Sequence, residues 1–139
     1  MARQLDNTDD YCFACGKDNP IGLHLDFKFD GDKYVAEKVI PREYQGYKGV
    51  VHGGILTTLL DEAMGGYIID KYSVMAMTGR LEIRYKHPTP INQKLTVTAW
   101  QESQRRNIFV MKASVALPNG TITAEATAKM AVVEDNGEE

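Results

Sequence analysis

The chain has 139 residues, 43% of them apolar and 25% charged, which is typical of a single globular domain. Its net charge of −3 gives no electrostatic reason to expect nucleic acid or an anionic membrane as a partner. No apolar run approaches the roughly 18 residues that a membrane span needs. Two cysteines and no secretory signal favour a reducing cytoplasm. We expect one domain over residues 1–139, with frayed tails over residues 1–10 and 134–139.

The first part of the chain predicts a β-hairpin. Residues 23–29 alternate between apolar and polar side chains, which is typical of a strand. Residues 30–32 have the composition of a tight turn, and residues 34–40 predict a second strand that Pro41 ends. Residues 42–51, rich in glycine and tyrosine, are expected to form a loop.

One long helix is predicted from about Gly53 to Lys71, because apolar side chains recur there at helical spacing. The stripe that they form is expected to face the core: Leu56, Leu59, Leu60, Ala63, Met64 and Tyr67.

Four strands are expected after the helix, over residues 80–86, 95–101, 107–117 and 121–133. Alternation in the first of them places three side chains on one face: Leu81, Ile83 and Tyr85. A single helix cannot cover both faces of a sheet of this size, so we predict an α+β fold in which an antiparallel sheet curls around one central helix. Because its edges stay uncovered, we also expect dimerisation.

The helix start and one acidic residue within the helix point to chemistry. Gly53 and Gly54 lack a Cβ atom, so a ligand can approach the backbone closely. The free N–H groups and the dipole of a helix N-terminus favour an anion or a polarised carbonyl oxygen. Asp61 follows roughly two to three turns later, on a small and polar flank that also carries Thr57. A carbonyl-activating turn with a carboxylate nearby suggests hydrolysis of an activated acyl group.

The run Val-His-Gly-Gly-Ile at residues 51–55, followed by Leu-Asp-Glu at residues 60–62, resembles the hotdog-fold acyl-CoA thioesterases of the phenylacetyl-CoA (PaaI-like) type. The order of elements fits this family over residues 23–133. The resemblance implies a hydrolase that converts an acyl- or aryl-CoA to the free acid and coenzyme A. It also implies a homodimer whose active sites are shared between two subunits, or a homotetramer of such dimers.

The resemblance assigns catalytic roles to five residues. The Gly53 N–H becomes the oxyanion donor, and His52 orients the turn or contacts the thioester. Asp61 becomes the nucleophile or the general base. Glu62 diverges from Asp61 by roughly 100° on the helix, so both cannot serve one site in one chain, and Glu62 is the second choice. Thr78, just before the next predicted strand, would hold the attacking water.

A further set of residues is expected to bind the substrate around the turn and at the coenzyme A phosphates: Gln45, Gly46, Gly54, Thr57, Arg80, Arg105 and Arg106. Many relatives carry an asparagine or glutamine six residues before the histidine, where this chain has Gly46. Gln45 could fill that role after a shift of one residue. If it does not, lower activity or a shared role for Glu62 is expected.

Cys12 and Cys15 form a Cys-x-x-Cys pair that we interpret as a structural turn before the first strand. A zinc site usually needs four ligands, and the pair supplies two, so a zinc ion shared across a dimer is the weaker alternative. Thioester hydrolysis by this mechanism needs no metal or redox cofactor, and we expect none.

Two other classes of protein remain open. A non-catalytic acyl-CoA binding protein would have the same fold, and the missing asparagine keeps this alternative. A hotdog enoyl-CoA hydratase or dehydratase would need a histidine base in a different sequence context from the one that precedes His52, so it ranks lower.

Overall fold

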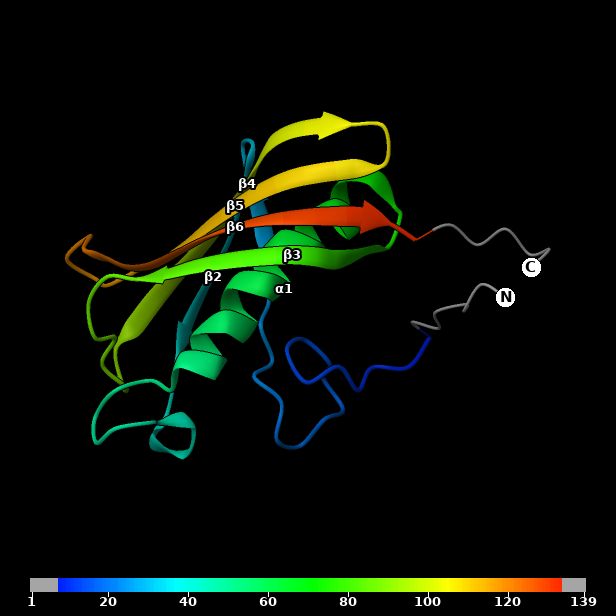
Figure 1. Cartoon of the computed structure of the whole chain (residues 1–139). Coiled ribbons are helices and arrows are strands. Elements are labelled where there is room, and N and C mark those ends of the chain that lie inside the picture. The colour runs from blue at the N-terminus through cyan, green and yellow to red at the C-terminus, as the bar shows by residue number, and fades with distance from the viewer. Residues whose placement is uncertain (1–7, 134–139) are drawn as a thin grey trace.

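The computed structural model describes residues 8–133, in which one antiparallel sheet of six strands packs against one long helix (Figure 1). The elements in chain order are β1 (Lys28–Asp30), β2 (Lys33–Val39), the 3₁₀ turn η1 (Arg42–Tyr44), α1 (Gly53–Tyr72), β3 (Ala76–Tyr85), β4 (Lys94–Arg105), β5 (Ile108–Ala116) and β6 (Ile122–Val132). The strand order is β1-β2-β4-β5-β6-β3, so β1 and β3 form the two edges. Helix α1 contacts all strands from β2 to β6, which confirms the predicted sheet around a central helix.

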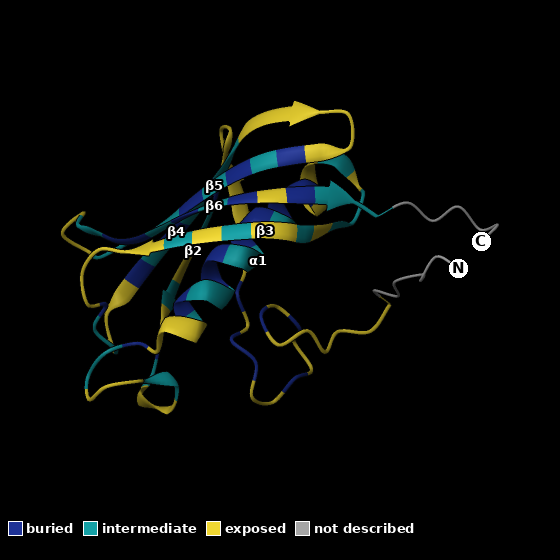
Figure 2. Cartoon of the chain, viewed as in Figure 1, coloured by how far each residue is buried: buried dark blue, intermediate teal, exposed yellow. Residues whose placement is uncertain are grey.

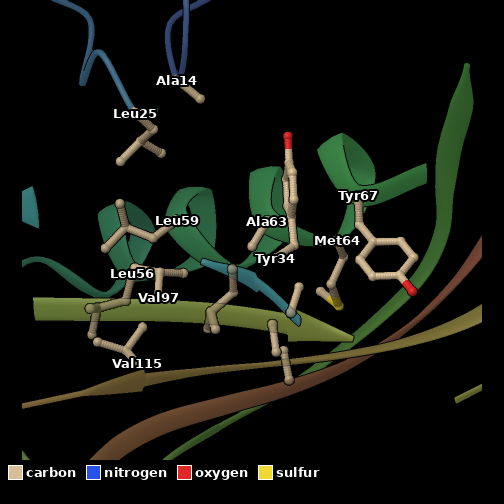
Figure 3. Close-up of a cluster of buried hydrophobic side chains, with 14 of the residues drawn as sticks. Ala14, Leu25, Tyr34, Leu56, Leu59, Ala63, Met64, Tyr67, Val97 and Val115 are labelled. Carbon is tan, nitrogen blue, oxygen red and sulfur yellow. The ribbon is translucent and has the colours of Figure 1, made fainter. Parts of the chain in front are cut away.

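Helix α1 buries the predicted apolar stripe. All six predicted side chains are buried, together with Gly66 and Ile68. Ala14 and Leu25 of the N-terminal segment lie on the side of the helix that faces away from Val97 and Val115 of the sheet (Figure 3). The helix is therefore covered on one side by the sheet and on another by the segment before β1. Figure 2 shows that buried positions gather along this contact, while the connecting loops are mostly exposed.

The predicted strand over residues 23–29 is wrong for most of its length, because only Lys28–Asp30 forms β1. The N–H groups of Leu23 and Leu25 donate to the carbonyls of Phe13 and Ala14, at 2.8 and 2.9 Å, instead of joining the sheet. Between them, His24 has a left-handed backbone with φ of 53°, which interrupts an extended strand. The alternating pattern reflects burial against α1 rather than membership of the sheet.

Strands β3 and β4 are longer than predicted, whereas β5 and β6 are each one residue shorter at both ends. Strand β3 begins at Ala76 rather than Arg80, and β4 continues to Arg105 rather than ending at Gln101. Both extensions pass a β-bulge, between Thr78 and Arg80 in β3 and between Gln101 and Ser103 in β4. A bulge shifts the side-chain alternation by one residue, so the period-two pattern stops at the bulge while the strand continues.

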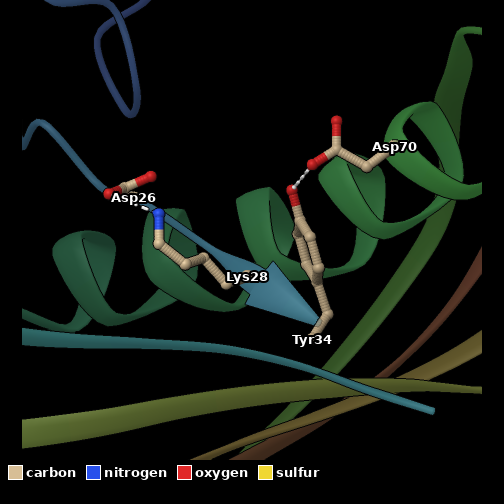
Figure 4. A network of polar contacts seen from close by, with 4 residues as sticks. All are labelled: Asp26, Lys28, Tyr34 and Asp70. Atoms are coloured by element: carbon tan, nitrogen blue, oxygen red, sulfur yellow. Dashed lines mark hydrogen bonds and ion pairs between the residues drawn. The ribbon is translucent and has the colours of Figure 1, made fainter. Parts of the chain in front are cut away.

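A polar contact ties β2 to the end of the helix. The Tyr34 hydroxyl donates a hydrogen bond to the Asp70 carboxylate, whereas Asp26 and Lys28 form an exposed ion pair nearby (Figure 4). The ring of Tyr34 is buried and lies against Gly66, where a Cβ atom would come within 3.1 Å of it.

Three further predictions concern the chain ends, dimerisation and membrane spans. The predicted tails include residues 1–7 and 134–139, which lie outside the described part of the chain. Dimerisation stays a prediction. Within residues 8–133, no helix combines the length and the apolar character that crossing a bilayer requires.

Candidate active site

The glycine turn at the start of α1 leaves one backbone donor unpaired. His52 is the N-cap, and its ring Nδ1 accepts a hydrogen bond of 2.9 Å from the Gly54 N–H. The carbonyl of Tyr44 accepts a hydrogen bond from the His52 N–H at 3.0 Å, which anchors the turn to the preceding loop. Among residues 8–133, the Gly53 N–H has no hydrogen-bond partner. Of the two predicted glycines, Gly53 therefore keeps a free donor at the helix N-terminus, and Gly54 uses its donor inside the turn.

Tyr85 stands beside this turn, at the end of β3. Its hydroxyl lies 2.7 Å from Thr57 Oγ1 and donates to the Gly53 carbonyl at 3.3 Å. Thr57 Oγ1 donates to the same carbonyl at 3.0 Å. The sequence placed Tyr85 on one strand face with Leu81 but gave it no role. Only the pairing of helix and strand shows that Tyr85 reaches the glycine turn.

Asp61 lies on the flank of α1 that faces β3. Thr78 Oγ1 donates a hydrogen bond of 2.6 Å to the Asp61 carboxylate. Thr78 precedes the bulge at Gly79, so its side chain turns toward the helix whereas Arg80 faces the outer side of the sheet. The structure thus brings together two residues that the sequence named separately. Ser73, the other hydroxyl residue between α1 and Thr78, is the C-cap of α1, with φ of 58°.

Glu62 points toward the N-terminal segment, where it is hydrogen-bonded to the Cys15 thiol. Burial raises the pKa of Glu62, with smaller contributions from the charges of Asp61 and Asp70, while the Cys15 hydrogen bond opposes the rise. Asp61 and Glu62 diverge as the helical geometry predicts. Both line one open pocket of about 430 Å³, and the expectation that only one of them serves a given site stays a prediction. The rest of this pocket is lined by Cys12, Phe13, Ala14, Thr57, Thr58, Thr78 and Leu81.

A second open pocket of about 440 Å³ lies at the glycine turn. Its walls are Gly46, Tyr47, Val50, Val51, His52 and Gly53. It shares no lining residue with the pocket that contains Asp61. Within one chain, the free donor and the carboxylate therefore open into different pockets.

Gln45 and Gly46 both support the loop before the turn. Gln45 Oε1 accepts a hydrogen bond of 3.0 Å from the Gly49 N–H, and Gln45 lines neither pocket. Gly46 packs against His52, where a Cβ atom would lie 3.2 Å from the His52 Cα. The side-chain oxygen of Gln45 is thus engaged within the loop, and Gln45 is not among the residues that line either pocket.

The three predicted arginines gather on the outer face of the sheet. Arg105 and Arg106 lie at the hairpin between β4 and β5 and line a pocket of about 590 Å³ together with Lys129. Lys129 is the cross-strand neighbour of Arg80. The sequence did not single out Lys129, because its place beside these arginines depends on the pairing of β3 with β6. Four cations thus lie on this part of the surface.

Comparisons with known proteins agree with this architecture. The sequence model of the Thioesterase superfamily matches residues 48–124, more than half of the chain. Mouse acyl-coenzyme A thioesterase THEM4 is 35% identical over 85 residues, which cover 60% of this chain and 36% of that protein. The rat THEM4 protein is 33% identical over the same shares. The chain thus spans about a third of the length of the curated relatives it matches.

Solved structures show the same fold at lower identity. The thioesterase superfamily protein RHA08564 has a TM-score of 0.81 and 23% identity, covering 88% of this chain and 60% of that one. The E. coli PaaI protein has a TM-score of 0.71 and 21% identity, covering 78% and 83%. A hypothetical thioesterase from Streptococcus pneumoniae, solved with coenzyme A, has a TM-score of 0.72 and 23% identity, covering 80% and 90%. At this level of identity, the likeness shows the fold.

Proposed function

The chain belongs to the Thioesterase superfamily as a PaaI-like hotdog domain, and we propose that it hydrolyses the thioester of an acyl- or aryl-CoA to the free acid and coenzyme A. One observation carries this proposal: helix α1 presents both a free backbone donor and an oriented carboxylate. The donor is the Gly53 N–H at the start of the helix, and the carboxylate is Asp61, which accepts a hydrogen bond from Thr78. Relatives named acyl-coenzyme A thioesterases and fold neighbours solved with acetyl CoA or coenzyme A support the choice of substrate class.

In the proposed reaction, the thioester carbonyl accepts a hydrogen bond from the Gly53 N–H. Negative charge develops on this oxygen as the tetrahedral intermediate forms, and one such donor contributes about 3–4 kcal/mol to transition-state stabilisation. Asp61 either attacks the carbonyl carbon or removes a proton from the water that attacks it. Thr78 donates to one carboxylate oxygen and so fixes the orientation of the group. The sulfur leaves as the thiolate of coenzyme A, and no metal or redox cofactor takes part.

The active site is proposed to form between two copies of the chain. The turn pocket and the Asp61 pocket share no lining residue, so a substrate in one of them reaches only half of the proposed machinery. A homodimer in which the glycine turn of one copy faces Asp61 of the other would unite the two halves. Strand β3 is a sheet edge and carries both Thr78 and Tyr85, so a second copy placed along it would lie beside the site. Two such dimers could pair as a tetramer.

The basic pocket on the outer face of the sheet is the proposed contact for the coenzyme A phosphates. Arg105, Arg106 and Lys129 line this pocket, Arg80 lies beside Lys129 on the neighbouring strand, and guanidinium groups match the geometry of phosphate oxygens. The free thiols of Cys12 and Cys15 fit the proposed reducing cytoplasm.

A non-catalytic acyl-CoA binding protein is the second candidate, and the position of Gln45 favours it. Gln45 Oε1 accepts a hydrogen bond from the Gly49 N–H, and Gln45 lines neither pocket of the proposed site, so its amide does not stand where the asparagine of many relatives would. A hydratase is disfavoured because the Nδ1 atom of His52 accepts a hydrogen bond from the Gly54 N–H as part of the helix cap.

The deciding experiment is hydrolysis of a panel of short, medium, long and aryl acyl-CoAs, with released thiol as the readout. We expect turnover of at least one substrate, and a kcat at least about 100-fold lower in Asp61→Asn, a loss of roughly 2.7 kcal/mol. The amide can still accept the Thr78 hydrogen bond, so this change isolates the charge. Glu62→Gln is the matched control. Acyl-CoA binding without hydrolysis in the wild type would favour the second candidate, and a larger loss in Glu62→Gln would transfer the catalytic role to Glu62.

A further inference from the structure

Three potential metal ligands meet beside the Asp61 pocket. The Sγ atoms of Cys12 and Cys15 and a carboxylate oxygen of Glu62 all lie within 4.8 Å of one another. The cysteines come from the N-terminal segment and Glu62 from α1, so the cluster exists only because the segment packs against the helix. The sequence alone offered two ligands, and folding supplies the third.

The backbone around the cysteines is shaped to present sulfur atoms. The Ala14 N–H donates to Cys12 Sγ at 3.3 Å, and the Gly16 N–H donates to the Cys12 carbonyl at 2.8 Å. A Cβ atom at Gly16 would lie 2.3 Å from the Cys12 N, so this tight turn requires glycine. A backbone N–H directed at a sulfur fixes the direction of that side chain, as the groups that surround metal ligands do.

The electrostatics of the cluster also favour a cation. Asp61 and Asp70 add negative charge toward Glu62. Among residues 8–133, no lysine, arginine or histidine forms a salt bridge with Glu62. A partly buried acidic group without a cationic partner is costly, and a divalent ion would offset that cost.

We propose that Cys12, Cys15 and Glu62 bind one Zn²⁺ ion that fastens the N-terminal segment to α1 beside Asp61. Two thiolates and one carboxylate are a ligand set that zinc accepts, and their ligand atoms already lie within 4.8 Å of one another. On binding, two S–H bonds break, two Zn–S bonds form, and both protons pass to solvent. Cys12 and Glu62 line the open Asp61 pocket, so the fourth position is left to water from that side.

The proposed site is separate from the hydrolysis mechanism, in which no step uses a metal. It engages Glu62 and leaves Asp61 with Thr78. The competing interpretation is a metal-free contact in which the Cys15 thiol only donates to Glu62. The first interpretation requires both sulfurs to bind a metal, with one ion per chain, and the second requires no metal. Metal binding can be measured whether or not the chain is a thioesterase.

Cobalt provides the test, because Co²⁺ bound by thiolates gives a sulfur-to-metal charge-transfer band. The full chain, freed of metal and kept reduced with a phosphine, is titrated with Co²⁺ and then with Zn²⁺. We expect the band to saturate at about one Co²⁺ per chain and to disappear on addition of Zn²⁺. We expect Cys12→Ser and Cys15→Ser to remove or shift the band, and Glu62→Gln to weaken Zn²⁺ binding at least about tenfold in competition with a chelating dye.

The matched control is Glu82→Gln, which removes the same charge from an exposed position on β3 and should leave the titration unchanged. Circular dichroism verifies that each variant is folded. A wild-type chain that gives no charge-transfer band overturns the proposal whatever the variants do. A band that persists in the double variant of Cys12→Ser and Cys15→Ser also overturns the proposal. The same holds if Glu62→Gln does not weaken Zn²⁺ binding.

Discussion

Thr78 Oγ1 donates a hydrogen bond of 2.6 Å to the carboxylate of Asp61 and so joins strand β3 to helix α1 at the proposed catalytic group. The bulge that follows Thr78 places this hydroxyl on the helix side of the sheet. A hydrogen bond to a charged group contributes about 1.5–3 kcal/mol, enough to hold one carboxylate orientation.

We predict that Thr78→Val lowers kcat by about 10–100-fold, because Asp61 loses the donor that orients it. Thr78→Ser keeps a hydroxyl and should retain most of the activity. Steady-state kinetics on the best acyl-CoA substrate measures both variants. Equal losses in the valine and serine variants would show that packing, and not the hydrogen bond, matters at this position.

Gly53 offers a way to remove a single backbone N–H. It is the first residue of α1, a position where proline fits, and the preceding His52 has φ of −60° and ψ of 139°, which proline tolerates in its neighbour. We predict that Gly53→Pro lowers kcat about 100–1,000-fold while the chain stays folded.

Gly53→Ala is the control for that change, since it keeps the N–H. Its Cβ atom would lie 3.8 Å from the Tyr85 ring, an ordinary contact, so activity should be largely retained. Kinetics and thermal melting of both variants test the donor. A proline variant as active as the alanine variant would remove Gly53 from the mechanism.

Gly65 and Gly66 form a matched pair for stability. A Cβ atom at Gly65 would meet Met130 at 3.6 Å, whereas one at Gly66 would approach the buried Tyr34 ring at 3.1 Å. We predict that Gly65→Ala stabilises the chain by up to about 1 kcal/mol through helix propensity. Gly66→Ala should lose that gain or destabilise the fold, because Tyr34 must move. Urea denaturation compares the two, and equal stabilisation would contradict the close packing of Tyr34.

The Tyr34 hydroxyl should make stability depend on pH in the alkaline range. Burial and the bond to Asp70 raise the Tyr34 pKa above that of an unfolded tyrosine. Above about pH 10, the unfolded chain therefore loses a proton that the folded chain keeps, and stability falls as pH rises, by up to about 1.4 kcal/mol per pH unit. Denaturation between pH 8 and 11 should show a shallower fall in Tyr34→Phe. Tyr47→Phe, at a residue that is 89% exposed, should match the wild type.

The basic pocket gives a prediction about KM. Arg105→Gln removes one of the charges proposed to contact coenzyme A phosphates, so KM for acyl-CoA should rise several-fold at low salt with little change in kcat. Lys94→Gln removes a charge that pairs with Glu37 instead, and its KM should stay near the wild-type value. A change confined to kcat in Arg105→Gln would argue against a phosphate contact.

The helix and the positions of Gly53 and Asp61 on it could be predicted from the sequence. The helix was predicted to begin at about Gly53, and α1 begins at that residue. The prediction succeeded because the glycine turn and the apolar stripe are local patterns, from which helical geometry gives the position of each side chain. Asp61 was predicted on a flank of that stripe for the same reason. The strand pattern was less reliable, since residues 23–27 alternate without joining the sheet.

Local patterns were enough to predict the helix, most of the strands, the wrapped sheet and the two ends of the proposed site. Folding of the whole chain establishes which distant residues meet: Thr78 at Asp61, Tyr85 at the glycine turn, and Glu62 at the paired cysteines. The difference lies in how far apart in the chain the interacting residues are. Periodicity and turn chemistry act over a few neighbouring residues, whereas strand register, bulges and the packing of the N-terminal segment on α1 depend on contacts between positions far apart in the chain.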